Sequence, residues 1–130
     1  MPETQKKVLI VEDEKLIVKP LAMKLELSGF EVKVAYNGEE ALETLEKEKF
    51  DIILLDLMMP KVDGFDVLAA LRKKKDRTPV IVASNLNQEG DVSRALELGV
   101  TSYYVKSDIT LDEIVDKIKE ALGMAQEALA

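Results

Sequence analysis

The chain has 130 residues, the length of one ordinary domain, and its 47% hydrophobic and 33% charged residues are typical of a folded globular protein. Its formal net charge of −7 disfavours binding to nucleic acid or to an anionic membrane. The sequence has no cysteine and no histidine, which excludes disulfides, Cys/His zinc sites and His- or Cys-dependent catalysis. No apolar run approaches about 18 residues and no signal peptide is evident, so we expect a cytoplasmic protein.

Short apolar runs alternate with amphipathic segments along the whole chain. The runs have the length and composition of strands, and the segments between them repeat apolar side chains at helical spacing. In chain order this pattern predicts strands at 7–11, 31–35, 51–55, 79–83 and 102–105. It predicts helices at about 14–28, 38–49, 64–75 and 88–98, and a last helix from Thr110 to about Leu122. The apolar residues that define the fourth helix are Val92, Ala95 and Leu96.

Turn and capping residues support these boundaries. Gly29 and Gly99 follow the first and fourth predicted helices, as glycine often does at a helix end. Asp63-Gly64 indicates a turn before the third helix, and Thr110 with Glu113 has the spacing of a capping box. Pro20 lies inside the first predicted helix, where its missing N–H should bend the helix.

Five strand–helix units predict an α/β fold with a five-stranded parallel sheet and helices on both faces. We expect one doubly wound domain whose core covers residues 6–122. Residues 123–130 are expected to be a helical tail or the start of a linker.

Polar residues follow four of the predicted strands. Glu12 and Asp13 follow the first, Asp56 the third, Ser84 the fourth and Lys106 the fifth. Because ligands of open parallel sheets bind beyond the carboxyl ends of the strands, we expect these side chains to gather at one rim.

The chemistry of this set points to a cation and a phosphoryl group. Two carboxylates about 4 Å apart repel each other by roughly 4 kcal/mol at an effective dielectric of about 20, and one lysine cannot balance three acids. Mg2+ prefers such oxygen ligands, and Asp13 at the head of a helix is a candidate ligand. Asp56, at the end of the central strand, is the best candidate nucleophile towards phosphorus. Lys106 and the hydroxyl of Ser84 could stabilise the transferring group.

Each residue also has a simpler interpretation when it is taken alone. Glu12 and Asp13 could cap the first helix, and Asp56 could open a turn. Ser84 could be an ordinary loop residue, and Lys106 an ordinary solvated lysine. Their shared position at one rim of the predicted sheet is what favours a site.

Four segments together closely resemble a bacterial response-regulator receiver domain. They are Val11-Glu12-Asp13-Glu14, the stretch from Asp56 to Gly64 (DLMMPKVDG), Ser84, and Tyr103-Tyr104-Val105-Lys106. The resemblance covers about residues 6–122 and implies a flavodoxin-like fold with strand order 2-1-3-4-5.

The resemblance also implies a role for each rim acid. Asp56 would accept a phosphoryl group from the phosphohistidine of a sensor histidine kinase or a phosphotransfer protein. Mg2+ would be bound by Asp13, Asp56 and the backbone carbonyl of Met58, with Glu12 acting mainly through water. The domain would then be a phosphoacceptor and not an enzyme.

Ser84 and Lys106 would contact the phosphoryl oxygens, and Tyr103 would turn inward as Ser84 moves towards the phosphate. A half-buried sheet aromatic is the simpler interpretation of Tyr103. The change would reshape the face of the fourth helix, fifth strand and fifth helix, where a second copy or a partner could bind. Four residues are candidates for that face: Val92, Leu96, Tyr104 and Lys117. For Leu96 we favour packing in the core.

The chain departs from the family pattern at two positions. Ser107 follows the rim lysine where the family usually has proline, and we expect its preceding peptide bond to be trans. Asn85 stands where a small residue is usual, and its side chain could narrow the donor's path or contact a phosphoryl oxygen. Met58 and Leu86, which would flank the attacking water, are both apolar and predict slow self-dephosphorylation.

Two other functions are compatible with parts of this pattern. A degenerate receiver would serve only as a dimerisation or docking module without taking phosphate. A flavin-binding flavodoxin is disfavoured, because Glu12-Asp13-Glu14 would repel the flavin phosphate.

Overall fold

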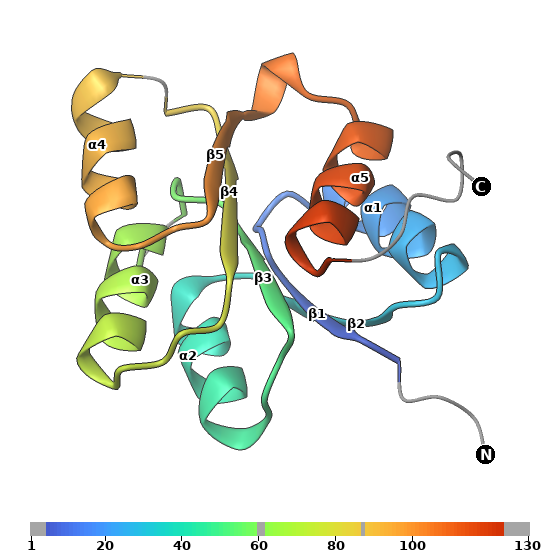
Figure 1. The fold of residues 1–130 in the computed structure, drawn as a ribbon, viewed down its shortest axis with the longest axis horizontal. Helices are drawn as coiled ribbons and strands as arrows, with labels where there is room; N and C mark the ends of the chain where they lie inside the picture. The colour runs from blue at the N-terminus through green and yellow to red at the C-terminus, as the bar shows by residue number, and fades with distance from the viewer. Residues whose placement is uncertain (1–4, 60–61, 87, 124–130) are drawn as a thin grey trace.

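The computed structural model describes residues 5–59, 62–86 and 88–123, and it has the predicted α/β architecture. A central sheet separates two layers of helices, with α1 and α5 on one face and α2, α3 and α4 on the other (Figure 1). The strands are β1 (Lys7–Val11), β2 (Glu31–Ala35), β3 (Ile52–Leu55), β4 (Val80–Ser84) and β5 (Ser102–Val105). The helices are α1 (Lys15–Leu27), α2 (Gly38–Lys47), α3 (Gly64–Lys73), α4 (Glu89–Glu97) and α5 (Leu111–Ala121).

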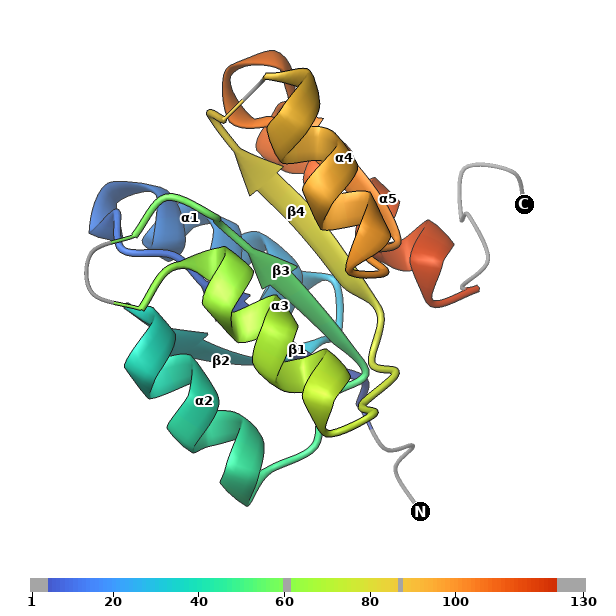
Figure 2. The same cartoon turned by 90° about the vertical axis from the view of Figure 1, so that its left-hand side faces the viewer.

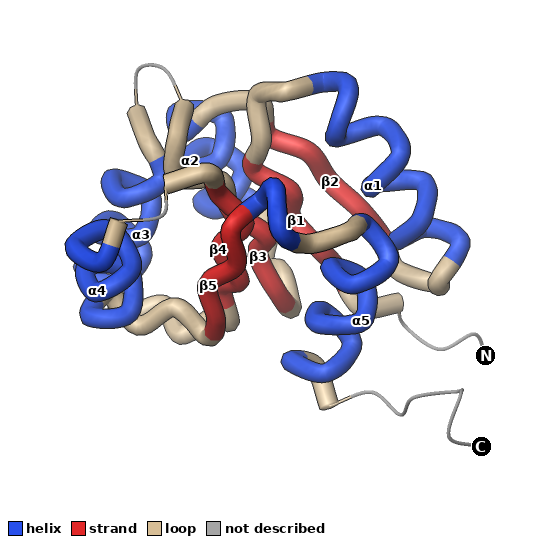
Figure 3. The backbone as a smooth tube through the Cα atoms, turned by 90° about the horizontal axis from the view of Figure 1, so that it is seen from above, coloured by secondary structure: helices blue, strands red, loops and turns tan. Residues whose placement is uncertain are grey.

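All five strands are parallel and their order is β2-β1-β3-β4-β5, which confirms the expected topology. β1, β3 and β4 lie inside the sheet, and nearly all their side chains are buried, as expected for strands covered on both faces. Seen from above, the two helical layers lie on either side of the strands (Figure 3).

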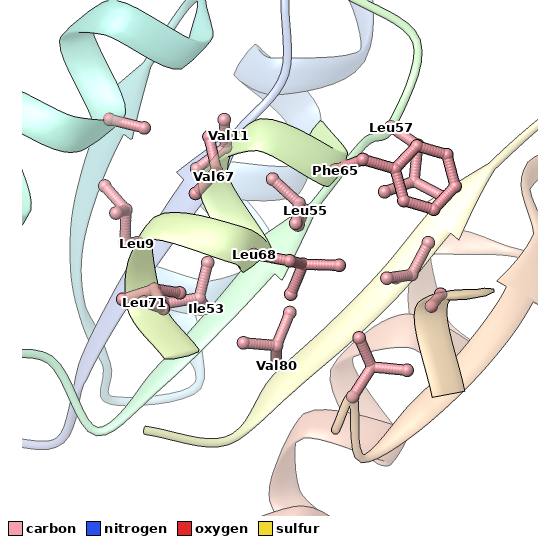
Figure 4. Close-up of a cluster of buried hydrophobic side chains, with 14 of the residues drawn as sticks. Leu9, Val11, Ile53, Leu55, Leu57, Phe65, Val67, Leu68, Leu71 and Val80 are labelled. Atoms are coloured by element: carbon pink, nitrogen blue, oxygen red, sulfur yellow. The ribbon is translucent and has the colours of Figure 1, made fainter. Parts of the chain in front are cut away.

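Successive side chains of each central strand enter different cores. The layer beneath α2, α3 and α4 receives Leu9, Val11, Ile53 and Leu55, which pack against residues of α3 such as Leu68 (Figure 4). The opposite layer receives their neighbours Val8, Ile10, Ile52 and Leu54, which pack against α1 and α5. This period of two, seen here as two separate cores, is the geometry of an extended strand.

Helix boundaries agree with the sequence except at two C-termini. α2 ends at Lys47 and α3 at Lys73, each two residues before the predicted end. Glu48 is already extended, with φ −135° and ψ 155°, and Lys75 has a left-handed φ of 59°. The capping box of Thr110 with Glu113 is formed as expected. Asp63 also caps α3 through a reciprocal pair with Asp66, so the predicted turn is a helix cap.

Arg72 ties two loops together at the end of the sheet where the strands begin. Its guanidinium donates to the backbone carbonyls of Asp76, in the α3–β4 loop, and of Leu98 and Gly99, in the α4–β5 loop. A single side chain therefore satisfies backbone carbonyls in the loops that follow two neighbouring helices, including that of the α4 C-cap residue Leu98.

The prediction that Leu96 packs in the core is wrong. Leu96 is 51% exposed, and within α4 only Ala95 is buried, while Val92 is partly exposed. Leu98, one residue beyond the helix, packs against the core instead. α4 is short and contacts the sheet through one narrow stripe. Residues two positions apart on a helix point in nearly opposite directions, so an error of two positions in the predicted periodicity exchanges the inner and outer apolar side chains.

Two further expectations concern particular residues. All described peptide bonds are trans, including the bond before Ser107, and residues 106–108 form a short 3-10 turn. Pro20 lies within α1 on its exposed side.

The expected tail or linker falls at residues 124–130, outside the part of the chain described. In that part, no helix has the length and apolar character needed to cross a membrane.

Candidate functional site

Four of the polar residues predicted at the strand ends, Glu12, Asp13, Asp56 and Lys106, lie together at the carboxyl edge of the sheet. β1 and β3 are neighbours, and hydrogen bonds from Asp56 N to Val11 O and from Glu12 N to Ala35 O continue the ladder past the strands. The backbone thus fixes Glu12 and Asp56 side by side, which is why residues 44 positions apart in the sequence share one site.

Three carboxylates form the centre of the site. Glu12, Asp13 and Asp56 each offer an oxygen, and these oxygens all lie within 4.8 Å of one another. Glu12 is 5% exposed and Asp56 4%, so two of the acids have little contact with solvent, while Asp13 is more accessible. Buried like charges at this distance are costly unless a cation balances them.

Lys106, the first residue after β5, supplies part of that balance. Its Nζ lies 2.7 Å from Glu12 Oε1 and 3.1 Å from Asp56 Oδ2. A third carboxylate, Glu14, reaches the same Nζ at 3.1 Å from the exposed side. The sequence did not predict the Glu14 contact, because the position of Glu14 at the first turn of α1 gave no sign that it would turn towards the rim.

Burial and neighbouring charges shift the pKa values of Glu12 and Lys106. Burial raises the pKa of Glu12 to about 7, and the charge of Asp56 adds to that effect, although the hydrogen bond from Lys106 opposes it. For Lys106, burial works against the charged form, but its contacts with Glu12 and Asp56 outweigh burial and raise its pKa. The rim therefore holds more negative charge than it can easily keep without a further cation.

The loop after Asp56 holds this side chain in place. Met58 N donates to Asp56 Oδ1 at 3.1 Å, and Gly64 N donates to Leu57 O at 3.2 Å. A Cβ added at Gly64 would lie 2.6 Å from both the Asp56 carbonyl oxygen and Leu57 Cα. Only glycine allows α3 to begin this close to the loop after Asp56, a reason for Gly64 that its turn-like dipeptide did not reveal.

Ser84 and Tyr103 lie on the β4 and β5 side of the rim. Ser84 is fully buried, and its Oγ accepts a hydrogen bond from Leu86 N at 3.3 Å. Tyr103 is half-buried against the core beneath α3, and its hydroxyl donates to the Leu86 carbonyl. Both residues therefore contact the backbone of the same β4–α4 loop residue.

The donor set is suitable for Mg2+. The three acids offer oxygen ligands only, one of them partly accessible to water, and their charge exceeds that of Lys106. A hard divalent cation would relieve this imbalance, and Mg2+ binds most often to sites that combine few carboxylates with water and phosphate oxygens. The Met58 backbone carbonyl follows Asp56 by two residues and is a further candidate ligand.

Comparisons with known proteins agree on one family. Residues 8–119 match the family model described as "Response regulator receiver domain". The chain is 45% identical over 101 residues to the alkaline phosphatase synthesis transcriptional regulatory protein PhoP of Bacillus subtilis, covering 78% of this chain and 42% of that protein. It is 44% identical to the probable transcriptional regulator ycf27 of Guillardia theta, covering 97% of this chain and 49% of the relative. The chain thus spans about half the length of these curated relatives.

Solved structures show the same similarity. The receiver domain of the Francisella response regulator 1452 has a TM-score of 0.85 and 33% identity, with 92% of this chain and 98% of that chain covered. A CheY-like response regulator receiver domain from Methanospirillum hungatei has a TM-score of 0.87 and 28% identity, with 92% and 95% covered.

Proposed function

Because the chain belongs to the response regulator receiver domain family, we propose that it is a phosphorylation-controlled switch whose phosphoryl acceptor is Asp56. One observation carries the proposal: the buried Asp56 carboxylate meets Lys106 and two further carboxylates at the carboxyl rim of the sheet. Such an acceptor is a two-component signalling module and not an enzyme with turnover of its own.

A phosphohistidine donor has to lie outside this chain, since the sequence contains no histidine. In the proposed step, an oxygen of Asp56 attacks the phosphorus of a phosphohistidine on a sensor kinase or phosphotransfer protein. The phosphorus–nitrogen bond breaks as the acyl phosphate bond forms, and the imidazole leaves with the electron pair and takes up a proton. Lys106 stays beside Asp56 and stabilises the negative oxygens of the transferring group.

We propose Glu12, Asp13, Asp56 and the carbonyl of Met58 as the residues that hold Mg2+, Glu12 through water. Bound there, Mg2+ would neutralise charge on the phosphoryl oxygens. The residues themselves orient Asp56 through Met58 N and keep Lys106 within 3.1 Å of the acceptor.

The switch would begin at Ser84. Its hydroxyl, which now accepts from Leu86 N, would turn to donate to a phosphoryl oxygen, and the β4–α4 loop would follow. Tyr103 would lose its present contact with the Leu86 carbonyl and turn inward. The reshaped face of α4, β5 and α5, with the exposed Leu96, is then the proposed surface for a second copy or a partner.

A stripe of exposed apolar residues on α1 offers a place for the phosphate donor. Leu16 is 92% exposed, Met23 61% and Leu27 85%, and with the exposed Pro20 they follow the four-three-four spacing of one helix face. The stripe starts next to the rim acids, so a helix of the donor that lies along it would bring its phosphohistidine to Asp56. Such exposed stripes are typical of protein-binding surfaces.

Phosphoryl uptake tests the proposal directly. The domain is incubated with Mg2+ and acetyl phosphate, and the intact mass is measured before and after. We expect the mass gain of one phosphoryl group, its loss in Asp56→Asn, and its loss when Mg2+ is chelated. An unchanged wild-type mass, together with no response to beryllofluoride, would contradict the proposal and favour a docking module that never takes phosphate.

A further inference from the structure

A second feature lies at the opposite end of the sheet, where β3 and β4 begin. The C-terminal ends of α2 and α3 lie side by side there (Figure 2), and the loops that follow them border a groove of about 470 Å3. Leu45 and the largely buried Phe50 provide apolar surface in this groove, and Lys49, Lys75 and Arg77 surround it. The proposed phosphorylation site uses none of these residues.

The positive charge of the groove is mostly uncompensated. Glu48, one of its two carboxylates, already binds Lys7 at 2.8 Å and Lys33 at 3.1 Å. Asp76, the other, accepts hydrogen bonds of 2.9 Å and 2.6 Å from Thr78, which carries no charge, so this carboxylate still offsets one of the groove's cations. Lys49, Lys74, Lys75 and Arg77 together outnumber it.

The remaining charges of the groove are cations. Lys74 makes only a 3.6 Å contact with Glu46. Within the described ranges, Lys49, Lys75 and Arg77 have no ion pair, although the whole chain carries a net charge of −7. A positive groove on a strongly acidic protein selects for an anionic partner.

We propose that this groove, formed by residues 45–50 and 74–78, binds an acidic peptide segment of a partner protein that carries apolar side chains between its carboxylates. The apolar side chains would contact Leu45 and Phe50, and the carboxylates would pair with Lys49, Lys75 and Arg77. A segment of this kind satisfies both parts of the groove, whereas a purely anionic ligand would leave the apolar surface in water.

Nucleic acid matches the groove less well. Tight binding to a duplex neutralises about 6–10 phosphates, more than this small group of cations can reach, and the acidic remainder of the surface would repel the polyanion.

The groove and the rim also lie at opposite ends of the parallel strands. Occupancy of the groove would therefore leave Asp56 open to its donor.

Fluorescence anisotropy tests this inference on the intact domain. The probe is a short fluorescein-labelled peptide in which central leucines are flanked on both sides by glutamates. One control peptide replaces the glutamates by glutamine, and the other replaces the leucines by serine. The protein variants are Lys75→Glu/Arg77→Glu in the groove and Lys117→Glu/Lys119→Glu on α5, across the sheet, which carry the same change of charge. Thermal unfolding followed by circular dichroism checks that both variants fold.

We expect the acidic peptide to bind at low salt and both control peptides to bind more weakly. The groove variant should lose affinity by about tenfold or more, since two attractive contacts become repulsive, and the α5 variant should lose far less. Raising the salt to about 0.5 M should weaken binding through screening. Amide chemical shifts should change around Lys49 and Lys75, and binding should be the same with and without beryllofluoride.

Three results would overturn the proposal. One is no binding of the peptide at low salt, and another is equal loss of affinity in the groove and α5 variants. The third is displacement of the acidic peptide by a short DNA duplex that binds with the same affinity, which would identify a general polyanion surface. None of these readouts depends on phosphorylation, so the groove and the rim can fail independently.

Discussion

At the scale of single residues, the rim holds more acid than folding alone would favour. Glu12, Asp13 and Asp56 face one another with the partly buried Lys106 as their cation, and burial has already raised the pKa of Glu12 to about 7. Groups arranged for ligand binding often reduce stability in the absence of the ligand. Replacing one of these acids should therefore stabilise the metal-free domain, whereas most substitutions destabilise a protein or leave its stability unchanged.

Asp13→Asn is expected to stabilise the metal-free domain, by about 1 kcal/mol, because it removes one of several mutually repelling carboxylates. It should also reduce the rise in thermal stability that Mg2+ gives the wild type. Thermal unfolding with and without Mg2+ measures both effects. Asp116→Asn, an exposed position on α5 with the same charge change, should alter neither. A variant that is destabilised without metal, or that keeps the full Mg2+ response, would contradict this account.

Met58→Asn is expected to shorten the lifetime of the phosphorylated domain by about fivefold, since one added hydrogen bond to the attacking water is worth about 1 kcal/mol. In the wild type, Met58 and Leu86 line the same surface hollow, and neither side chain has a hydrogen-bond donor or a strong acceptor to orient water, so we expect a lifetime of hours. Release of phosphate from the purified phosphoprotein, followed over time, gives the rate. Complete release by the wild type within a minute would refute this view of the two apolar residues.

At the scale of elements, the start of α3 depends on a glycine. Gly64→Ala should cost about 1–3 kcal/mol of stability, because its Cβ would overlap backbone atoms of Asp56 and Leu57 that cannot move without distorting the loop after Asp56. Phosphoryl uptake should fall with it. Gly90→Ala in α4 is the matched control: a Cβ there meets nothing within 4 Å, and alanine is the better helix former. Denaturant unfolding compares the two, and equal stabilities would count against the steric argument.

The loop between α3 and β4 gives the fold a pH dependence. Hydrogen bonds from Thr78 lower the pKa of Asp76, so its stabilising contribution is present above the unfolded-state pKa and is lost as the pH falls through the folded-state pKa. Asp76→Asn keeps an acceptor but loses the charge, and it should cost about 1 kcal/mol at neutral pH. Between pH 5 and strongly acid conditions the difference from the wild type should shrink. Unfolding free energies measured across that range, with exposed Asp108→Asn as control, test the sign.

The sequence predicted elements well where one physical signal dominates. The apolar runs of β1, β3 and β4 indicated strands buried on both faces, and the strand-end residues indicated which side chains would meet. α4 shows where such signals weaken. Its nine residues include only a narrow buried stripe, and the periodicity assigned Leu96 to the core when Leu98 packs there.

Long-range polar contacts were the other part that the sequence could not predict. Glu14 reaches Lys106 although the two residues are 92 positions apart, and nothing in its local pattern distinguishes it from a solvated acid. Arg72 likewise has the sequence context of an ordinary basic residue at a helix end. Such contacts depend on how whole loops approach each other, which composition and periodicity do not encode.

At the scale of the whole molecule, the sheet separates its two ends as well as its two faces. The acids gather at the carboxyl ends of the strands, and the cationic groove lies at their amino ends, with the cores of both helical layers between them. The polarity of a parallel sheet, in which all strands run in one direction, is what sorts these loops. A single small domain thereby carries two surfaces of opposite charge that do not compete for space.

The hydrogen bonds made by Arg72 also determine which end of α4 can move. This side chain clamps the carbonyls just beyond the C-terminus of α4, whereas the N-terminus begins at Gln88 without a side-chain cap. A displacement of the loop after Ser84 would then rotate α4 about its C-terminal end, which the hydrogen bonds of Arg72 hold in place. The displacement would be largest at the end nearest the acceptor and smallest beside the guanidinium.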